Sequence, residues 1–140
     1  MDHVTDSQEL HRHQSRALTI LARAVASFEE GPRALLVASA GIRAELGEAL
    51  GGYQRFKHEH IFDPAIASGD EQRVVLARHM KVACISAGEV FRVHMATWSP
   101  ERIAADWTNY AVAARLTVNQ LRRHIRTEAE GIADLLTAYA

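Results

Sequence analysis

Small and apolar side chains recur at alternating steps of three and four residues along the last third of the chain. Residues at these steps share one face of an α-helix. The face consists of Trp107, Tyr110, Ala114, Thr117, Leu121, His124, Glu128, Gly131, Leu135 and Ala138. A helix with such a continuous stripe must bury it against other elements, so the periodicity predicts a packed helical fold.

Three earlier stretches show the same periodicity, and glycine or proline separates them. We expect helices over about residues 6–30, 33–63, 71–98 and 100–139, with a loop or a loose last turn over 64–70. Ser99 and Pro100 are a typical N-cap and first-turn pair for the fourth helix. The expected inner face of the third helix is Leu76, His79, Ala83, Ser86, Val90 and Val93, widened by Met80, Ala87 and Phe91.

Four helices with short connections favour one all-α domain over residues 1–140, an antiparallel up-down-up-down four-helix bundle. Hydrophobic residues make up 48% of the 140, which is enough for the core of one domain. We see no strand-like alternation and no internal repeat.

Charge and cysteine content restrict the function. Lys and Arg number 16 and Asp and Glu 17, which argues against a nucleic-acid surface held by bulk electrostatics. The single cysteine, Cys84, excludes an intrachain disulfide and a Cys-rich metal site. No signal peptide is visible, and no apolar run reaches the roughly 20 residues that cross a bilayer. We therefore expect a cytoplasmic monomer or homodimer without a membrane partner.

His124 and Glu128 interrupt the apolar stripe of the fourth helix. Burying an ionisable pair without partners is costly, so the fold must supply a compensating group. The His-x-x-x-Glu spacing presents an imidazole and a carboxylate on one helix face, one turn apart. These donors suit iron, manganese or zinc.

The chain has eight histidines, and helix lengths predict that several lie at the height of His124. At about 1.5 Å of rise per residue, His79 lies 21 residues before Pro100 and His124 lies 24 after it, so the two share a level. His58 and His60 belong near the same end of the bundle. His11 fits less well, and His94 belongs at the opposite end.

Two segments resemble the hemerythrin-like (HHE cation-binding) family. Leu121-Arg-Arg-His124-Ile-Arg-Thr-Glu128-Ala-Glu130 is similar to its last helix, and His58-Glu59-His60-Ile-Phe62-Asp63-Pro64-Ala-Ile66 to the end of its second helix. The resemblance implies a four-helix bundle that holds one or two non-haem iron ions, binds or senses oxygen, nitric oxide or peroxide, or buffers iron. The metal ligands that it implies here are His11, His58, His60, Asp63, His79, His124 and Glu128. Three choices stay open, namely His58 or His60, His11 or His13, and Asp63 or Glu59 as the substitute carboxylate.

The sequence departs from the family's pattern at two helices. The second helix of the family normally carries His-x-x-x-Glu, whereas Gln54 and His58, or Phe56 and His60, stand at those places. The family's oxygen carriers have two histidines in the third helix, but His79 has no such companion. A metal-free regulatory or protein-interaction module that has lost the metal site is therefore the alternative. A metal-dependent enzyme, such as a peroxide-handling oxidoreductase, is a third alternative. No separate nucleophile or acid–base constellation selects it, so a binding protein is favoured over an enzyme.

Overall fold

The computed structural model describes the backbone of residues 3–30 and 32–137, and the side chains of residues 6–30 and 40–136. These residues are almost entirely helical and contain no strand, which confirms the predicted all-α class. The elements are α1 (His3–Glu29), α2 (Pro32–Lys57), the π-helix η1 (His58–Phe62), α3 (Asp63–Ala67), α4 (Glu71–Thr97), α5 (Pro100–Ala105) and α6 (Trp107–Thr137). None of these described helices is long and apolar enough to cross a membrane.

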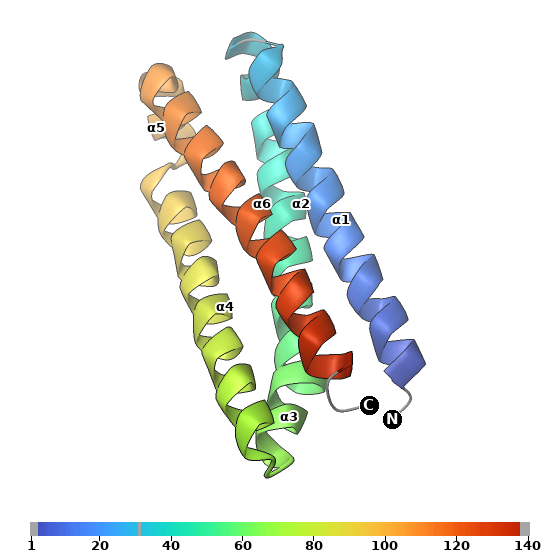
Figure 1. Cartoon of the computed structure of the whole chain (residues 1–140). Helices are drawn as coiled ribbons and strands as arrows, with labels where there is room; N and C mark the ends of the chain where they lie inside the picture. Colours follow the sequence, from blue (N-terminus) through green and yellow to red (C-terminus); the bar gives the residue numbers. More distant parts are fainter. Residues whose placement is uncertain (1–2, 31, 138–140) are drawn as a thin grey trace.

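The four long helices α1, α2, α4 and α6 lie side by side (Figure 1). α1 packs against α2 and α6, and α6 also packs against α4, whereas α2 and α4 make few contacts with each other. The largest fully buried side chains between them are Tyr53, Phe62, Leu21, Ile125, Ile132 and Leu135. A smaller cluster of Trp98, Ile103, Tyr110 and Ala114 packs where α5 joins α4 to α6.

Local caps fix the ends of several helices. The Asp70 and Ser99 side chains accept hydrogen bonds from the first-turn backbone N–H groups of α4 and α5, as N-cap residues do. The predicted Ser99 cap followed by Pro100 is therefore confirmed. At the other end of α4, the Arg43 guanidinium donates to the carbonyl oxygen of Trp98 at 2.6 Å and so ties α2 to this terminus.

Two predicted boundaries differ from the structure. In the segment expected as a loop or a loose last turn over residues 64–70, the short helix α3 continues to Ala67, because Pro64 suits a first helical turn. The helix expected over residues 100–139 is broken at Asp106, whose side chain accepts a hydrogen bond from Asn109 at 3.0 Å. The Asp106 backbone itself leaves the helical region, with φ −138° and ψ 60°. α6 ends at Thr137, and the predicted end at Tyr139 lies outside the described residues.

The predicted central stripe of α4 is wrong by about one residue, although Met80, which the prediction added to this face, is buried. Ala77, Met80 and Cys84 are its buried residues, whereas Val93 is 52% exposed and His79 is exposed. Successive residues of an α-helix are rotated by about 100°, so a shift of one residue places a predicted core position on the solvent side. α4 carries apolar residues on several sides. Packing against the other helices, and not the sequence repeat, therefore determines which side is buried.

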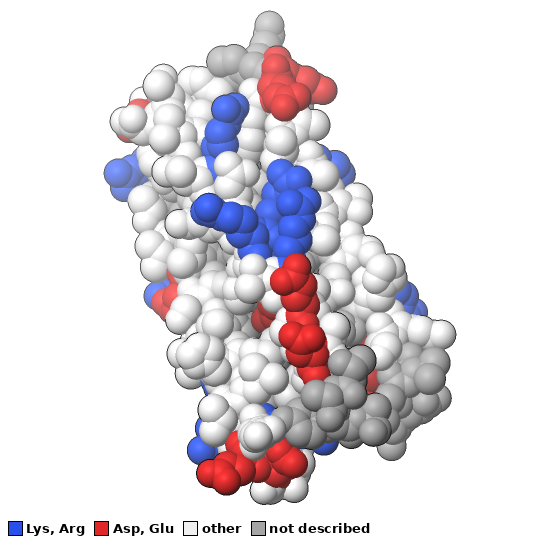
Figure 2. All heavy atoms as spheres, in the orientation of Figure 1, with Lys and Arg blue, Asp and Glu red and all other residues white. Residues whose placement is uncertain are grey.

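The face formed by α1 and α6 carries charges of both signs. Figure 2 shows basic side chains gathered in the upper half of this view, with acidic side chains above them, directly below them and at the lower end. No single sign of charge covers this view of the described residues.

Candidate functional site

A buried ion pair joins Lys57 at the end of α2 to Glu128 on α6. The Nζ atom of Lys57, the last residue of α2, donates to Oε1 of Glu128 on α6 at 2.7 Å. The two side chains are only 4% and 3% exposed. Lysine is rarely buried without a partner, so this geometry compensates two charges that would each be costly alone.

The sequence explains why Lys57 faces inward. Leu46, Leu50 and Tyr53 mark the inner face of α2 at steps of four and three, and a further step of four reaches Lys57. The π-helix η1 begins at the next residue, and the backbone N–H of Asp63 donates to the carbonyl of His58 across it. A π-helical turn changes the phase of the residues that follow it. Lys57 therefore holds the last inward position before that change.

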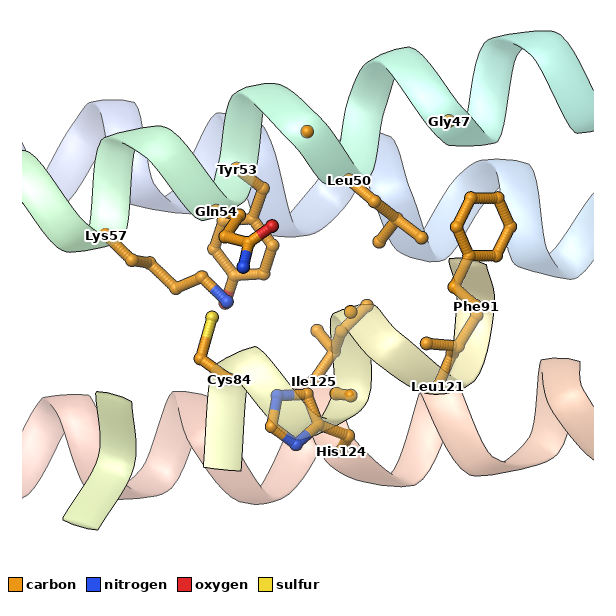
Figure 3. A pocket seen from close by; sticks show the side chains of 13 residues that line it. Gly47, Leu50, Tyr53, Gln54, Lys57, Cys84, Phe91, Leu121, His124 and Ile125 are labelled. Carbon is orange, nitrogen blue, oxygen red and sulfur yellow. The ribbon is translucent and has the colours of Figure 1, made fainter. Parts of the chain in front are cut away.

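The ammonium of Lys57 has further neighbours besides Glu128. It lies 3.8 Å from the centroid of the Tyr53 ring, a cation–π distance. Figure 3 shows it between that ring and the thiol of Cys84 on α4. Burial raises the pKa of the Cys84 thiol, and burial together with the charge of Glu128 raises the pKa of Tyr53. Both groups are thus neutral neighbours of the ion pair at neutral pH.

His124 contacts the other oxygen of the same carboxylate. Its Nε2 lies 3.3 Å from Oε2 of Glu128, one helical turn away on α6. Neither atom has a hydrogen-bond partner among the described residues. Burial alone would raise the pKa of Glu128, but His124 and Lys57 together lower it below its usual value. Glu128 is therefore held as a carboxylate.

The other predicted ligands on α1, α3 and α4 lie away from this carboxylate. His11 is exposed on α1 beside Ser15, with 3.4 Å between Nε2 and Oγ. His79 is exposed on α4. Asp63 is exposed and accepts a hydrogen bond from Nζ of Lys81 at 2.7 Å. His79 and Asp63 therefore both lie on solvent-exposed sides of their helices.

His58 and His60 follow Lys57 in η1, and aromatic rings hold both. The His58 ring packs against Phe62 with centroids 5.6 Å apart, and burial lowers its pKa. The His60 ring stacks on Phe56 at 4.9 Å, and its Nδ1 lies 4.0 Å from a carboxylate oxygen of Asp6. Among the described residues, no hydrogen bond or ion pair joins either histidine to Glu128, although the charge of Glu128 acts to raise the pKa of His58 against the effect of burial.

Of the seven predicted ligands, the structure brings only His124 and Glu128 together. Within the described residues, no group of three or more His, Cys, Asp or Glu side chains could hold a metal ion. His79 is exposed on α4, and no metal-holding group joins it to His124 among the described residues. Lys57, which the sequence reasoning missed, stands where a ligand from the second helix was expected.

His94 lies at the opposite end of the molecule, as the sequence predicted. Its ring stacks on Tyr110 with centroids 5.9 Å apart, and Arg43 lies over the same tyrosine. Burial, with a contribution from the charge of Arg43, lowers the pKa of His94 to about 4. The residue is thus a neutral packing group at neutral pH.

A pocket of about 150 Å³ opens beside the ion pair, between α2, α4 and α6 (Figure 3). Lys57, Tyr53, Gln54, Cys84 and His124 line one part of it. The rest is lined by small or apolar residues, namely Gly47, Leu50, Gly51, Ala87, Gly88, Phe91, Leu121 and Ile125. The site thus combines an internally neutralised cation with a space that a small molecule can enter.

Comparisons with protein-family models, with curated proteins and with solved structures found no match to this chain. The resemblance to the hemerythrin-like family therefore rests on the two sequence segments alone and stays a prediction.

Proposed function

We propose that this chain is a metal-independent regulatory module with an up-down-up-down four-helix bundle architecture. In this module, the ammonium of Lys57 takes the electrostatic role that a metal cation has in the iron-binding bundles that the sequence resembles. The observation that carries the proposal is the 2.7 Å contact between Nζ of Lys57 and Oε1 of Glu128, with both side chains buried. The side-by-side packing of α1, α2, α4 and α6 supports the architecture.

The charge balance around Glu128 favours this function. A buried carboxylate needs one close positive charge, and Lys57 supplies it directly. A metal held by Glu128 would bring a second cation close to the ammonium. Two like unit charges 4 Å apart repel by about 4 kcal/mol at an effective dielectric constant of about 20. Together with the separate positions of His11, His58, His60, Asp63 and His79, this repulsion makes the donor set a poor fit for iron.

The function expected from the sequence is the second candidate, namely iron binding for sensing oxygen, nitric oxide or peroxide, or for buffering iron. The observation that favours it is the 3.3 Å separation of His124 Nε2 and Glu128 Oε2, neither of which has a hydrogen-bond partner among the described residues. These are donor types that iron, manganese and zinc accept. They are only two, however, and Lys57 binds the same carboxylate, so the metal-independent function is better supported.

The location and assembly expected from the sequence remain part of the proposal. We place the module in the cytoplasm as a monomer or homodimer. Composition supports this, with 16 basic and 17 acidic residues and a single cysteine.

Metal content and metal-dependent stability test the proposal. The protein is purified without a histidine tag, its iron, manganese and zinc are measured, and thermal unfolding is followed with a chelator and with Fe(II). We expect no stoichiometric metal, no absorbance band with Fe(II) in air, and the same melting temperature in both conditions. Stoichiometric iron together with a melting temperature that the chelator lowers would replace this function with the second candidate.

A further inference from the structure

The pocket beside Lys57 has one polar end and one apolar end. Figure 3 shows the ammonium of Lys57 with Gln54 and Cys84 at one end, and Leu50 and Phe91 at the other. Tyr53 and His124 also contribute to the lining. A ligand that fills this space must therefore be amphipathic, with its polar group at the Lys57 end.

The charge of the lining selects the sign of that polar group. Lys57 is its only permanently charged residue among those described, and no Asp or Glu lines it. Glu128 accepts a hydrogen bond from the ammonium and is not part of the lining. The lining includes two side chains that carry several N–H donors, namely the ammonium of Lys57 and the amide group of Gln54. Glu128 accepts only one of the three ammonium N–H groups, so a ligand carboxylate can share the ammonium with Glu128. A ligand cation instead meets the charge of Lys57.

The apolar end fixes the size of the ligand. A volume of about 150 Å³ equals that of cavities that take a single benzene molecule. Leu50, Phe91 and Leu121 provide aliphatic and aromatic surfaces that can pack against the apolar part of a ligand of this size.

Entry is possible between α2 and α4, which make few contacts with each other. Gly47 and Gly51 on α2 and Ala87 and Gly88 on α4 line the pocket there. A Cβ atom added at Gly47 would lie 3.9 Å from the Phe91 ring, so a longer side chain at this position would extend into the apolar end.

We propose that this pocket binds a small monocarboxylate with an apolar body of about six carbons, its carboxylate at Lys57 and Gln54 and its body against Leu50 and Phe91. This inference rests on the proposed function, because it requires an ammonium at Lys57 that no metal displaces. It names the ligand class that the module would respond to.

Calorimetric titration of the 140-residue chain tests the ligand class with hexanoate, benzoate, hexan-1-ol and hexylamine as probes. We expect hexanoate and benzoate to bind with dissociation constants on the order of 0.1 mM, a plausible value for ligands of this size. Hexan-1-ol should bind at least tenfold more weakly, and hexylamine should not bind. Equal affinity for hexanoate and hexan-1-ol, or no binding of either carboxylate, overturns the proposal.

Two glycine variants on α2 test the location. Gly47→Leu places a side chain at the apolar end, and Gly41→Leu is its matched control, since nothing lies within 4 Å of a Cβ atom at Gly41. We expect Gly47→Leu to weaken benzoate binding at least tenfold and Gly41→Leu to leave it unchanged. Unchanged affinity in Gly47→Leu overturns the assignment to this pocket.

A charge variant tests the head group. Lys57→Met combined with Glu128→Gln removes both charges of the buried pair together, so neither is left alone. Circular dichroism checks that this variant folds, and carboxylate affinity should fall at least tenfold to the level of hexan-1-ol. If the variant does not fold, the comparison of hexanoate with hexan-1-ol on the unaltered protein decides the same point.

Iron content measured on the titrated sample separates this proposal from the proposed function. Protein that carries iron overturns the metal-independent function. Iron-free protein that binds neither carboxylate overturns the ligand class alone.

Discussion

The ammonium of Lys57 contacts the carboxylate of Glu128 at 2.7 Å, although 71 positions of the chain separate the two residues. This contact joins the end of α2 to α6, and it lies beside a pocket that α4 also lines. A single ion pair therefore compensates the charge of Glu128 in the α6 stripe and places the ammonium of Lys57 in the lining of the adjacent pocket.

Removing one partner of this pair should strongly destabilise the protein. Lys57→Met leaves Glu128 buried without its ammonium, and such a loss typically costs about 3–5 kcal/mol. The double variant Lys57→Met with Glu128→Gln should recover more than half of that loss, because no uncompensated charge remains. Urea unfolding of the two single variants and the double variant measures the coupling free energy. A coupling near zero would mean that the two side chains do not interact in solution.

The free energy of unfolding should decrease at acidic pH because the Glu128 carboxylate becomes protonated. The pKa of this carboxyl is lowered from 4.5 in the folded protein, so its contribution is fully present above pH 4.5 and is lost as pH falls through the folded value. Glu128→Gln should therefore reduce the slope of unfolding free energy against pH below pH 4.5, by up to about 1.4 kcal/mol per pH unit. Glu48→Gln, a change at an exposed position, is the control and should leave the slope nearly unchanged. Equal slopes in all three proteins would contradict the assignment.

His94 should give the free energy of unfolding a second pH dependence, separate from that of Glu128. Its pKa falls from 6.5 to about 4 on folding, so the unfolded chain binds a proton at this residue between these values and the folded protein does not. Stability is thus lost as pH falls from 6.5 toward 4. His94→Phe keeps a ring against Tyr110 and should flatten the stability profile over this interval. Guanidinium unfolding at several pH values measures it, and an unaltered profile would show that His94 titrates normally.

The helices and their caps could be predicted from sequence because their signals are local. The apolar repeat gives the α6 face, where Tyr110, Ala114, Leu121 and Leu135 are buried as expected. Ser99 with Pro100 likewise marks the start of α5. The face of α4 could not be predicted, since apolar residues lie on several of its sides and only packing decides among them.

The candidate site could be predicted only in part. The interruption of the stripe by His124 and Glu128 identified half of it from sequence. The partner from α2 was expected to be a histidine, and the structure has Lys57 there. Its position at the end of the Leu46, Leu50, Tyr53 repeat was a usable signal, but lysine is so commonly exposed that the pattern alone did not select it.

Two glycines in long helices should respond oppositely to alanine. Gly41→Ala on α2 should stabilise the protein by about 0.5–1 kcal/mol, because alanine restricts the unfolded chain and nothing lies within 4 Å of the added Cβ. At Gly131 on α6 the same Cβ would lie 3.0 Å from Cε of Met80, a buried residue of α4. Gly131→Ala should therefore lose most or all of that gain as α4 and α6 are pushed apart. Thermal unfolding of both variants measures the difference, and Met80→Ala in the Gly131→Ala background should reduce the cost of the added methyl. Equal stabilisation at both glycines would mean that Met80 moves aside freely and that this helix contact is loosely packed.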